Sequence, residues 1–237
     1  MAEEIIGIPL NNRNKPNNLQ ESTVIPIQEK EAMNVSKLFV LVHPVDTPTK
    51  SPETERMITE IERRFTVGET DVLWFMPLSD IQTLSGFRKE LKRVSEHTQQ
   101  DHDLNNWPEL YKKLRDKFPG RVLLMTDIVA GVKDQSGNDR VQEILDRTKE
   151  KGLKITKDTE LILGGTYLDL CVKNVGINLL ESLEVNELKL DTKASTYYMV
   201  EKGLAITKIL RDIESNRALK MHASFDPKTE FVTIAKT

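Results

Sequence analysis

Cysteine is the scarcest reactive residue in this chain, which has 237 residues and a single cysteine, Cys171. One cysteine cannot form an intramolecular disulfide, and no cluster of cysteines suggests a structural zinc site. A chain with this cysteine usage is typical of a reducing compartment, so we expect a cytoplasmic protein.

Long apolar runs are absent as well. No stretch approaches the ~20 apolar residues that a membrane-spanning helix needs. The segment "MAEEIIGIPLNNRNKPNN" has neither the cationic start nor the apolar core of a classical signal peptide. The net charge is only -3 and aromatic residues make up 5% of the chain. We therefore expect neither a membrane nor a nucleic acid among the partners.

Motifs for nucleotides and metals are also missing. The glycine-containing segments match neither the Walker lysine-serine pattern nor GxGxxG. The densest group of metal-ligand residue types is His97, Asp101, His102 and Asp103, which we interpret as part of a surface loop. We expect no cofactor and no metal.

The N-terminal residues differ in composition from the rest of the chain. The segment "NNRNKPNNLQEST" has five asparagines, one proline and almost no apolar residue. Such a segment buries too little surface to offset the entropy of ordering it. We expect residues 1–35 to form a flexible arm and residues 36–237 to form one domain.

Apolar runs alternate with helical patterns after the arm. Helices are expected near 51–65, 81–94, 107–118, 138–152, 171–183 and 197–213. Strands are expected at 37–43, 71–77, 121–128, 160–165, 186–192 and 230–236. This alternation predicts an α/β fold, a single three-layer domain with a six-stranded mainly parallel sheet flanked by helices.

Reactive side chains gather at the ends of the expected strands. In parallel sheets, ligand sites lie beyond the carboxyl ends of the strands, where the strand order reverses. The candidates that follow strands are His43, Asp46, Asp127, Lys133, Asp169 and Cys171. We expect these side chains to lie along one edge of the sheet.

Cys171 follows the strand and turn in "LILGGTYLDLCV" and is expected to open a helix. Backbone N–H groups at a helix N-terminus favour a thiolate over a thiol. The N–H groups of Leu170 and Cys171 could also hold a developing oxyanion. The alternative is that Cys171 is an ordinary small apolar residue of the core.

The same segment resembles the isochorismatase-like cysteine hydrolases, which include the nicotinamidases. Gly165, Asp169, Cys171 and Val172 match the glycine, the acidic residue and the Cys-Val pair of that family. "LKLDTKAS", which contains Asp191, is similar to the segment that follows in the family. The resemblance covers residues 36–237 in outline and 161–195 at the level of motifs.

This resemblance implies a triad formed by an aspartate that ends the first strand, a lysine after the third strand, and the cysteine. Here His43 stands at the position of the aspartate, and Asp46 follows three residues later. Lys133 is the nearest candidate for the lysine. A histidine is a competent base for a thiol, and Asp46 or Asp127 could orient it.

Two functions follow from these residues. The first is a divergent isochorismatase-like cysteine hydrolase acting on a small carboxamide or a related substrate. The second is a catalytically inactive member of the same fold that binds a protein partner, for example through its N-terminal arm. The sequence leaves a homo-oligomer open. The predicted catalytic residues are Cys171, His43, Asp46 and Lys133, and the predicted binding residues are Leu170, Asp169 and Asp127.

Overall fold

The computed structural model describes residues 32–44, 52–77, 107–129, 131–133, 137–198 and 201–237. The expected helix at 81–94 lies outside these residues, and so do Asp46 and most of the expected arm.

Helices and strands alternate along the described chain. The strands are β1 (Met33–Asn34), β2 (Lys37–Val42), β3 (Val72–Met76), β4 (Val122–Leu124), β5 (Leu153–Lys154), β6 (Glu160–Gly165), β7 (Glu187–Ser195), β8 (Met221–Asp226) and β9 (Phe231–Lys236). The helices are α1 (Pro52–Thr66), α3 (Trp107–Lys117), α4 (Arg140–Glu150), the π-helical turn η1 (Leu168–Val172), α5 (Lys173–Ser182), α6 (Lys202–Ser215) and the 3-10 turn η2 (Arg217–Leu219).

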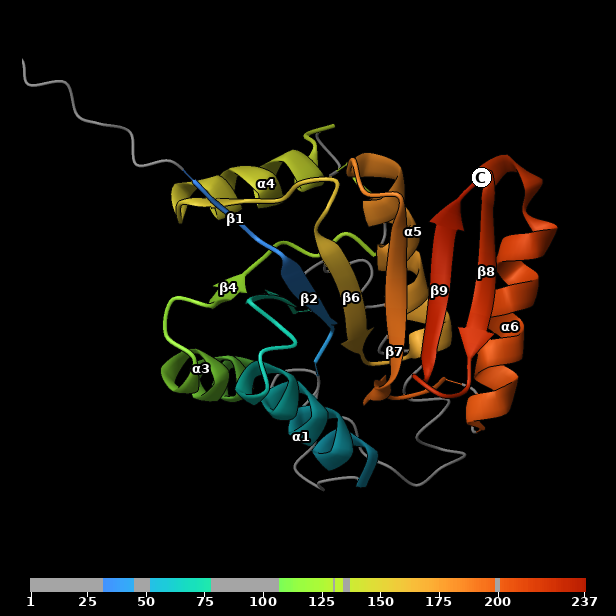
Figure 1. The fold of residues 1–237 in the computed structure, drawn as a ribbon, viewed down its shortest axis with the longest axis horizontal. Helices are drawn as coiled ribbons and strands as arrows, with labels where there is room; N and C mark the ends of the chain where they lie inside the picture. The colour runs from blue at the N-terminus through green and yellow to red at the C-terminus, as the bar shows by residue number, and fades with distance from the viewer. Residues whose placement is uncertain (1–31, 45–51, 78–106, 130, 134–136, 199–200) are drawn as a thin grey trace, which may run out of the picture. The chain divides into compact units, whose positions relative to one another are not determined.

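One large sheet has the strand order β4-β3-β2-β6-β7-β9-β8 (Figure 1). The first five strands of this order are parallel, and β9 is antiparallel to both of its neighbours. The predicted α/β fold with a mainly parallel sheet is confirmed. The described sheet has seven strands rather than six, because Met221–Asp226 forms a hairpin with β9.

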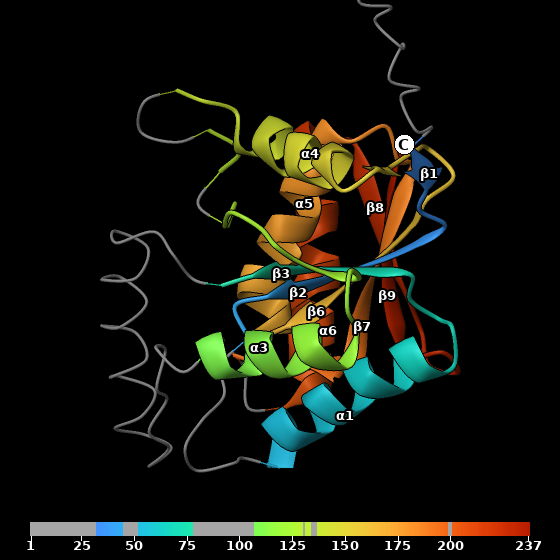
Figure 2. The ribbon, with the colours of Figure 1, turned by 90° about the vertical axis from the view of Figure 1, so that its left-hand side faces the viewer.

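Helices cover both faces of this sheet, as Figure 2 shows for α1 and α3 below it and for α4 and α5 above it. Along β2, Phe39 and Leu41 pack on the side of α1 and α3. Leu38, Val40 and Val42 pack on the opposite side, with apolar residues of α4, α5 and α6. The continuous apolar run of β2 therefore reflects a strand that is buried on both faces.

The folded part of the chain begins earlier than residue 36. β1 pairs with β5, and the Met33 N–H donates to the Gly152 carbonyl over 2.7 Å. The Val35 N–H donates to the Lys154 carbonyl over 2.9 Å, and the Val35 side chain is buried. The last residues of the expected arm thus belong to the domain.

A glycine lets β6 approach β2 closely. Gly165 has a φ of 136°, and a Cβ atom there would lie 2.0 Å from the Val42 carbonyl oxygen. Only glycine fits both this conformation and this approach. The chain that follows β6 therefore begins beside the end of β2.

Candidate functional site

His43, Asp127 and Cys171 leave the sheet at the same edge. His43 directly follows β2, and Cys171 follows β6, which is the neighbour of β2 in the sheet. Asp127 lies three residues beyond β4. The chain passes from β2 to β3 and β4 on one side, and later to β6 and β7 on the other. The space between β2 and β6 is therefore the point at which the strand order reverses.

The three side chains are in contact. The Nε2 atom of His43 lies 2.9 Å from Oδ1 of Asp127, and both side chains are almost completely inaccessible. His43 also forms a side-chain hydrogen bond with Cys171, which is buried. A buried imidazole thus connects a carboxylate to the only sulfhydryl group of the chain.

The surroundings of His43 favour its protonated form. Burial alone would lower the pKa of His43, because it disfavours a charged imidazole. The hydrogen bonds to Asp127 and Cys171, and the negative charges of both, outweigh burial and raise the pKa to about 10. A pKa in this range favours the protonated imidazole at neutral pH.

Asp127 is held in place by contacts on several sides. Its Oδ1 atom also accepts a hydrogen bond from the Val129 N–H over 2.9 Å, and its carbonyl accepts one from Arg140 of α4 over 3.1 Å. The Asn178 side chain of α5 donates to the Ile128 carbonyl over 2.7 Å. Asp127 is thus a fixed partner for His43.

The backbone of His43 has an uncommon conformation. Its φ is 46°, in the left-handed region that few residues other than glycine adopt. The His43 N–H donates to the Met76 carbonyl at the end of β3 over 2.8 Å. Strained backbone of this kind is concentrated at functional sites in proteins.

Cys171 lies inside the π-helical turn η1 rather than at the first position of an α-helix. The turn begins after Tyr167, whose φ is 62°, and α5 begins at Lys173. The Tyr167 carbonyl accepts hydrogen bonds from the N–H groups of Leu170 over 3.1 Å and Val172 over 3.2 Å. The Leu170 N–H is therefore engaged within the turn, and its role toward an oxyanion stays a prediction.

The segment that follows β7 fixes η1. The Leu168 N–H donates to the Thr196 carbonyl over 2.8 Å, and the Tyr167 N–H donates to the Thr196 hydroxyl over 3.1 Å. In return, the Tyr198 N–H donates to Oδ1 of Asp169 over 2.9 Å. The acidic residue of the Cys171 motif thus holds two segments of backbone together.

A second group of charges fixes η1 from the side of α6. Oδ2 of Asp212 lies 2.5 Å from the ammonium nitrogen of Lys173 and 2.7 Å from that of Lys208. Lys208 also donates to the Asp169 carbonyl over 3.4 Å. Burial, which is the largest influence, lowers the pKa of Lys173. No pattern in the sequence indicates this group, because lysines and aspartates of a helix usually face solvent.

Lys133, a predicted catalytic residue, and Asp191, which belongs to the segment that resembles the family, lie apart from this group. Lys133 is exposed, its backbone pairs with Asp139, and no contact joins it to Cys171 among the described residues. Asp191 is buried and lies 2.5 Å from Arg64 of α1, so it connects α1 to β7. Asp46 is outside the described residues.

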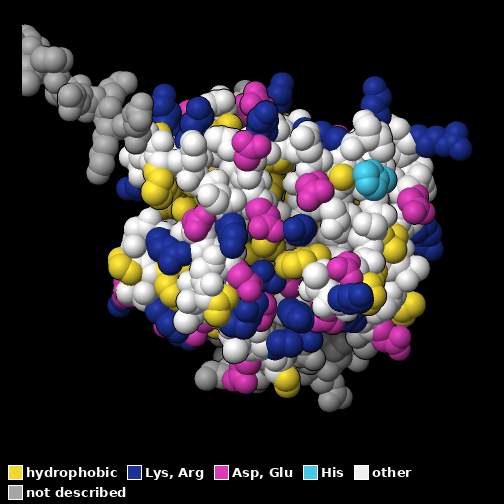
Figure 3. Space-filling model, viewed as in Figure 1, with side chains coloured by type: hydrophobic (Ala, Val, Ile, Leu, Met, Phe, Trp, Pro, Cys, Tyr) yellow, Lys and Arg dark blue, Asp and Glu magenta, His cyan; other side chains and the backbone are white. Residues whose placement is uncertain are grey.

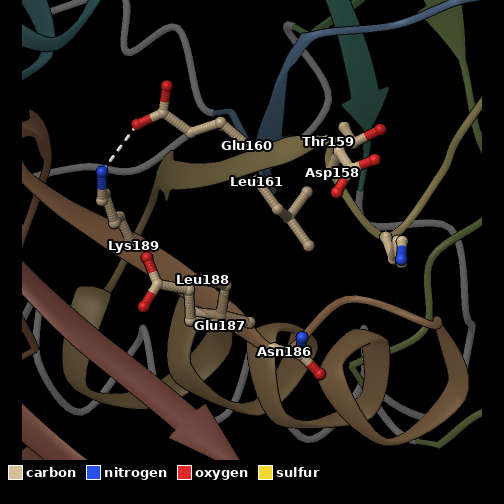
Figure 4. Close-up of a pocket in the computed structure, with 9 residues that line it drawn as sticks. Asp158, Thr159, Glu160, Leu161, Asn186, Glu187, Leu188 and Lys189 are labelled. Atoms are coloured by element: carbon tan, nitrogen blue, oxygen red, sulfur yellow. Dashed lines mark hydrogen bonds and ion pairs between the residues drawn. The ribbon is translucent and has the colours of Figure 1, made fainter.

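A polar pocket of about 420 Å³ opens at the opposite edge of the sheet, where the amino ends of β6 and β7 diverge (Figure 4). Lys189 of β7 reaches Glu160 of β6 over 2.7 Å. The pocket is lined by residues 157–161 and 186–189, and neither His43 nor Cys171 is among them. Lys and Arg side chains are interspersed with Asp and Glu side chains over the face seen in Figure 3. That face offers no extended area of one sign of charge.

No three His, Cys, Asp or Glu side chains are grouped to hold a metal ion in the part of the chain that the structure describes. None of the described helices is both long enough and apolar enough to cross a membrane. A scan against protein-family models, a search of the curated proteins and a search of the solved structures gave no match.

Proposed function

We propose that this chain is a cysteine-dependent hydrolase that acts on a small carboxamide or a related acyl compound, as a divergent isochorismatase-like protein. The observation that carries the proposal is the contact of His43 with both Asp127 and Cys171. Nucleophile, base and orienting acid in this order are the arrangement that nucleophilic catalysis needs.

The roles follow from the chemistry of each group. In the reactive state the proton of the Cys171 thiol is on His43, and the sulfur attacks the carbonyl carbon to form a C–S bond. The C–N bond then breaks as the His43 imidazolium gives its proton to the leaving amine. Water, deprotonated by His43, attacks the thioester and releases the acid and the thiol. Asp127 orients the imidazole and stabilises its positive charge.

This assignment differs from the triad that the resemblance implies. His43 takes the proton-relay role of the family's aspartate, and Asp127 takes the supporting role for which Asp46 was an alternative. Lys133 has no part in the proposal, because it is exposed and the buried pair of His43 and Asp127 already supplies the charge beside the sulfur.

A binding function without catalysis is favoured by one observation. Cys171 is only 3% exposed and His43 only 1% exposed, so the described chain gives a substrate little access to the sulfur. An inactive member of the fold would keep this buried polar group for its contribution to the structure.

Trapping an acyl-enzyme decides between the two functions. The chain is incubated with small activated esters and carboxamides, and intact mass spectrometry detects acyl adducts while ammonia release is measured. The hydrolase forms an adduct at Cys171 and turns over, and Cys171→Ala forms none. His43→Gln, which keeps a polar side chain of similar length, loses at least about a hundredfold in rate. If the native, Cys171→Ala and His43→Gln proteins all release ammonia only at the background rate, the chain has a binding function without catalysis.

A further inference from the structure

Asp169 has a carboxylate oxygen without a partner. The side chain is completely buried, and its Oδ1 atom accepts the Tyr198 N–H over 2.9 Å. Among the described residues, no hydrogen-bond donor reaches its Oδ2 atom. An unpaired carboxylate oxygen in the interior is costly, so natural proteins usually supply a donor. The missing donor is a feature that a ligand can provide.

Two tyrosines interact with this carboxylate, Tyr198 through its backbone N–H and Tyr167 through its electrostatic effect, and their rings pack against each other. The rings of Tyr167 and Tyr198 meet edge to face, with their centroids 5.6 Å apart. Burial first, and then the charges of Cys171, Tyr198 and Asp169, raise the pKa of Tyr167. The Tyr167 phenol is therefore in the electrostatic range of both the sulfur and the carboxylate. Ring faces attract cations, and more so where water is excluded.

The ionisable side chains around Cys171 also include more than one buried carboxylate. Asp127 and Asp169 each contribute a buried carboxylate, and the Oδ2 atom of Asp127 likewise receives no hydrogen bond within the described chain. His43 supplies one positive charge when it is protonated. The nearby ammonium groups of Lys173 and Lys208 share the single carboxylate of Asp212. With Cys171 as the thiolate of the proposed function, these groups together carry one excess negative charge, which favours a positively charged ligand.

We infer that Asp169, together with the rings of Tyr167 and Tyr198, forms a subsite for a positively charged nitrogen group of the substrate, either a primary ammonium or a guanidinium. This inference rests on the proposed function, because it assigns the substrate class of the same site. Asp169 and Cys171 are two residues apart on a helical turn, so their side chains leave it in different directions. The cationic group is therefore separated by several bonds from the carbonyl that the sulfur attacks.

Charged thiol reagents test this subsite without any turnover. The sulfur of a methanethiosulfonate forms a mixed disulfide with a thiolate and releases methanesulfinate. Cys171 is the only cysteine, so every modification is at the site. The aminoethyl reagent is cationic and the sulfonatoethyl reagent is anionic. Their rates with the native chain are each divided by their rates with free 2-mercaptoethanol.

The subsite predicts that the cationic reagent is favoured by about tenfold or more in the native chain. Asp169→Asn keeps an oxygen for the Tyr198 N–H and removes the charge, so most of this preference disappears. Tyr198→Leu keeps the N–H that Asp169 binds and removes one ring, so the preference falls by a smaller factor. Asp158→Asn is the matched control: it removes an exposed carboxylate at the opposite edge of the sheet and leaves the preference unchanged.

Three results would overturn the inference. They are equal normalised rates in the native chain, a preference that persists in both the Asp169→Asn and Tyr198→Leu proteins, and modification of the unfolded chain alone. The outcome is separate from that of the proposed hydrolase. A preference for the cationic reagent without amide turnover would contradict the hydrolase and support the subsite. Turnover of neutral and cationic amides at equal rates would support the hydrolase and contradict the subsite.

Discussion

Replacing Asp127 by asparagine removes the charge that faces the buried His43 and keeps the size of the side chain. The amide oxygen that replaces the carboxylate can still accept the Val129 N–H, which lies 2.9 Å from Oδ1 of Asp127. The substitution Asp127→Asn therefore isolates the electrostatic contribution of the carboxylate to His43.

The expected loss follows from the pKa of His43. This pKa is raised from 6.5 to about 10 in the folded chain, and Asp127 and Cys171 are the groups that raise it. At about 1.4 kcal/mol per pKa unit, the whole effect is on the order of 5 kcal/mol. We expect Asp127→Asn to lower the free energy of unfolding by about 2–4 kcal/mol at pH 6.

The pH dependence gives the sign of the effect. Because the folded pKa of His43 lies above the unfolded pKa, the stabilisation is complete below pH 6.5 and is lost as the pH rises through about 10. Urea unfolding of the native and Asp127→Asn proteins at pH 6 and pH 10 measures this, and the difference should shrink to below ~1 kcal/mol at pH 10. Asp158→Asn, on an exposed side chain, should change stability by less than ~0.5 kcal/mol at both values. If the free energies of unfolding of the native and Asp127→Asn proteins differ as much at pH 10 as at pH 6, His43 is not charged in the folded protein.

Two further predictions concern the framework of the site. Gly165→Ala places a Cβ atom 2.0 Å from the Val42 carbonyl oxygen, so thermal or urea unfolding should show a loss above ~3 kcal/mol. Gly176→Ala meets only side-chain atoms at 3.4 Å in a helix, so a change within about 1 kcal/mol is expected, and equal losses for both would contradict the steric argument. Arg64→Met leaves the buried Asp191 without its ion pair and should cost about 3–5 kcal/mol in the same assay, whereas no loss would mean that water replaces the guanidinium.

The sequence predicted the central strands because their apolar runs are long and uninterrupted. β2, β3 and β6 lie where those runs predicted them, and His43 and Cys171 were predicted at one edge because both follow the carboxyl ends of parallel strands. β8 was missed because its alternating pattern in "MHASFD" contains only three apolar residues and is half exposed. Alternation of period two was present there as a signal, although weak.

The details of the site were less predictable. The π-helical turn around Cys171 depends on hydrogen bonds to the Tyr167 carbonyl and to Thr196, which no local pattern encodes. Asp127 and Asp46 were equal alternatives as the partner of His43, since spacing along the chain does not tell which strand end lies nearer. The contact with Asp127 is a tertiary one, and only the packing of the chain after β4 against α4 and α5 produces it.

The rate at which iodoacetamide alkylates Cys171 at pH 6 tests the central claim most directly, because it asks whether His43 activates the sulfur. The native chain is compared with the same chain unfolded in urea and with the His43→Gln protein. The account predicts that native Cys171 reacts at least about tenfold faster than the unfolded thiol and that His43→Gln abolishes this advantage. A native rate no faster than the unfolded one, and unchanged by His43→Gln, would contradict it.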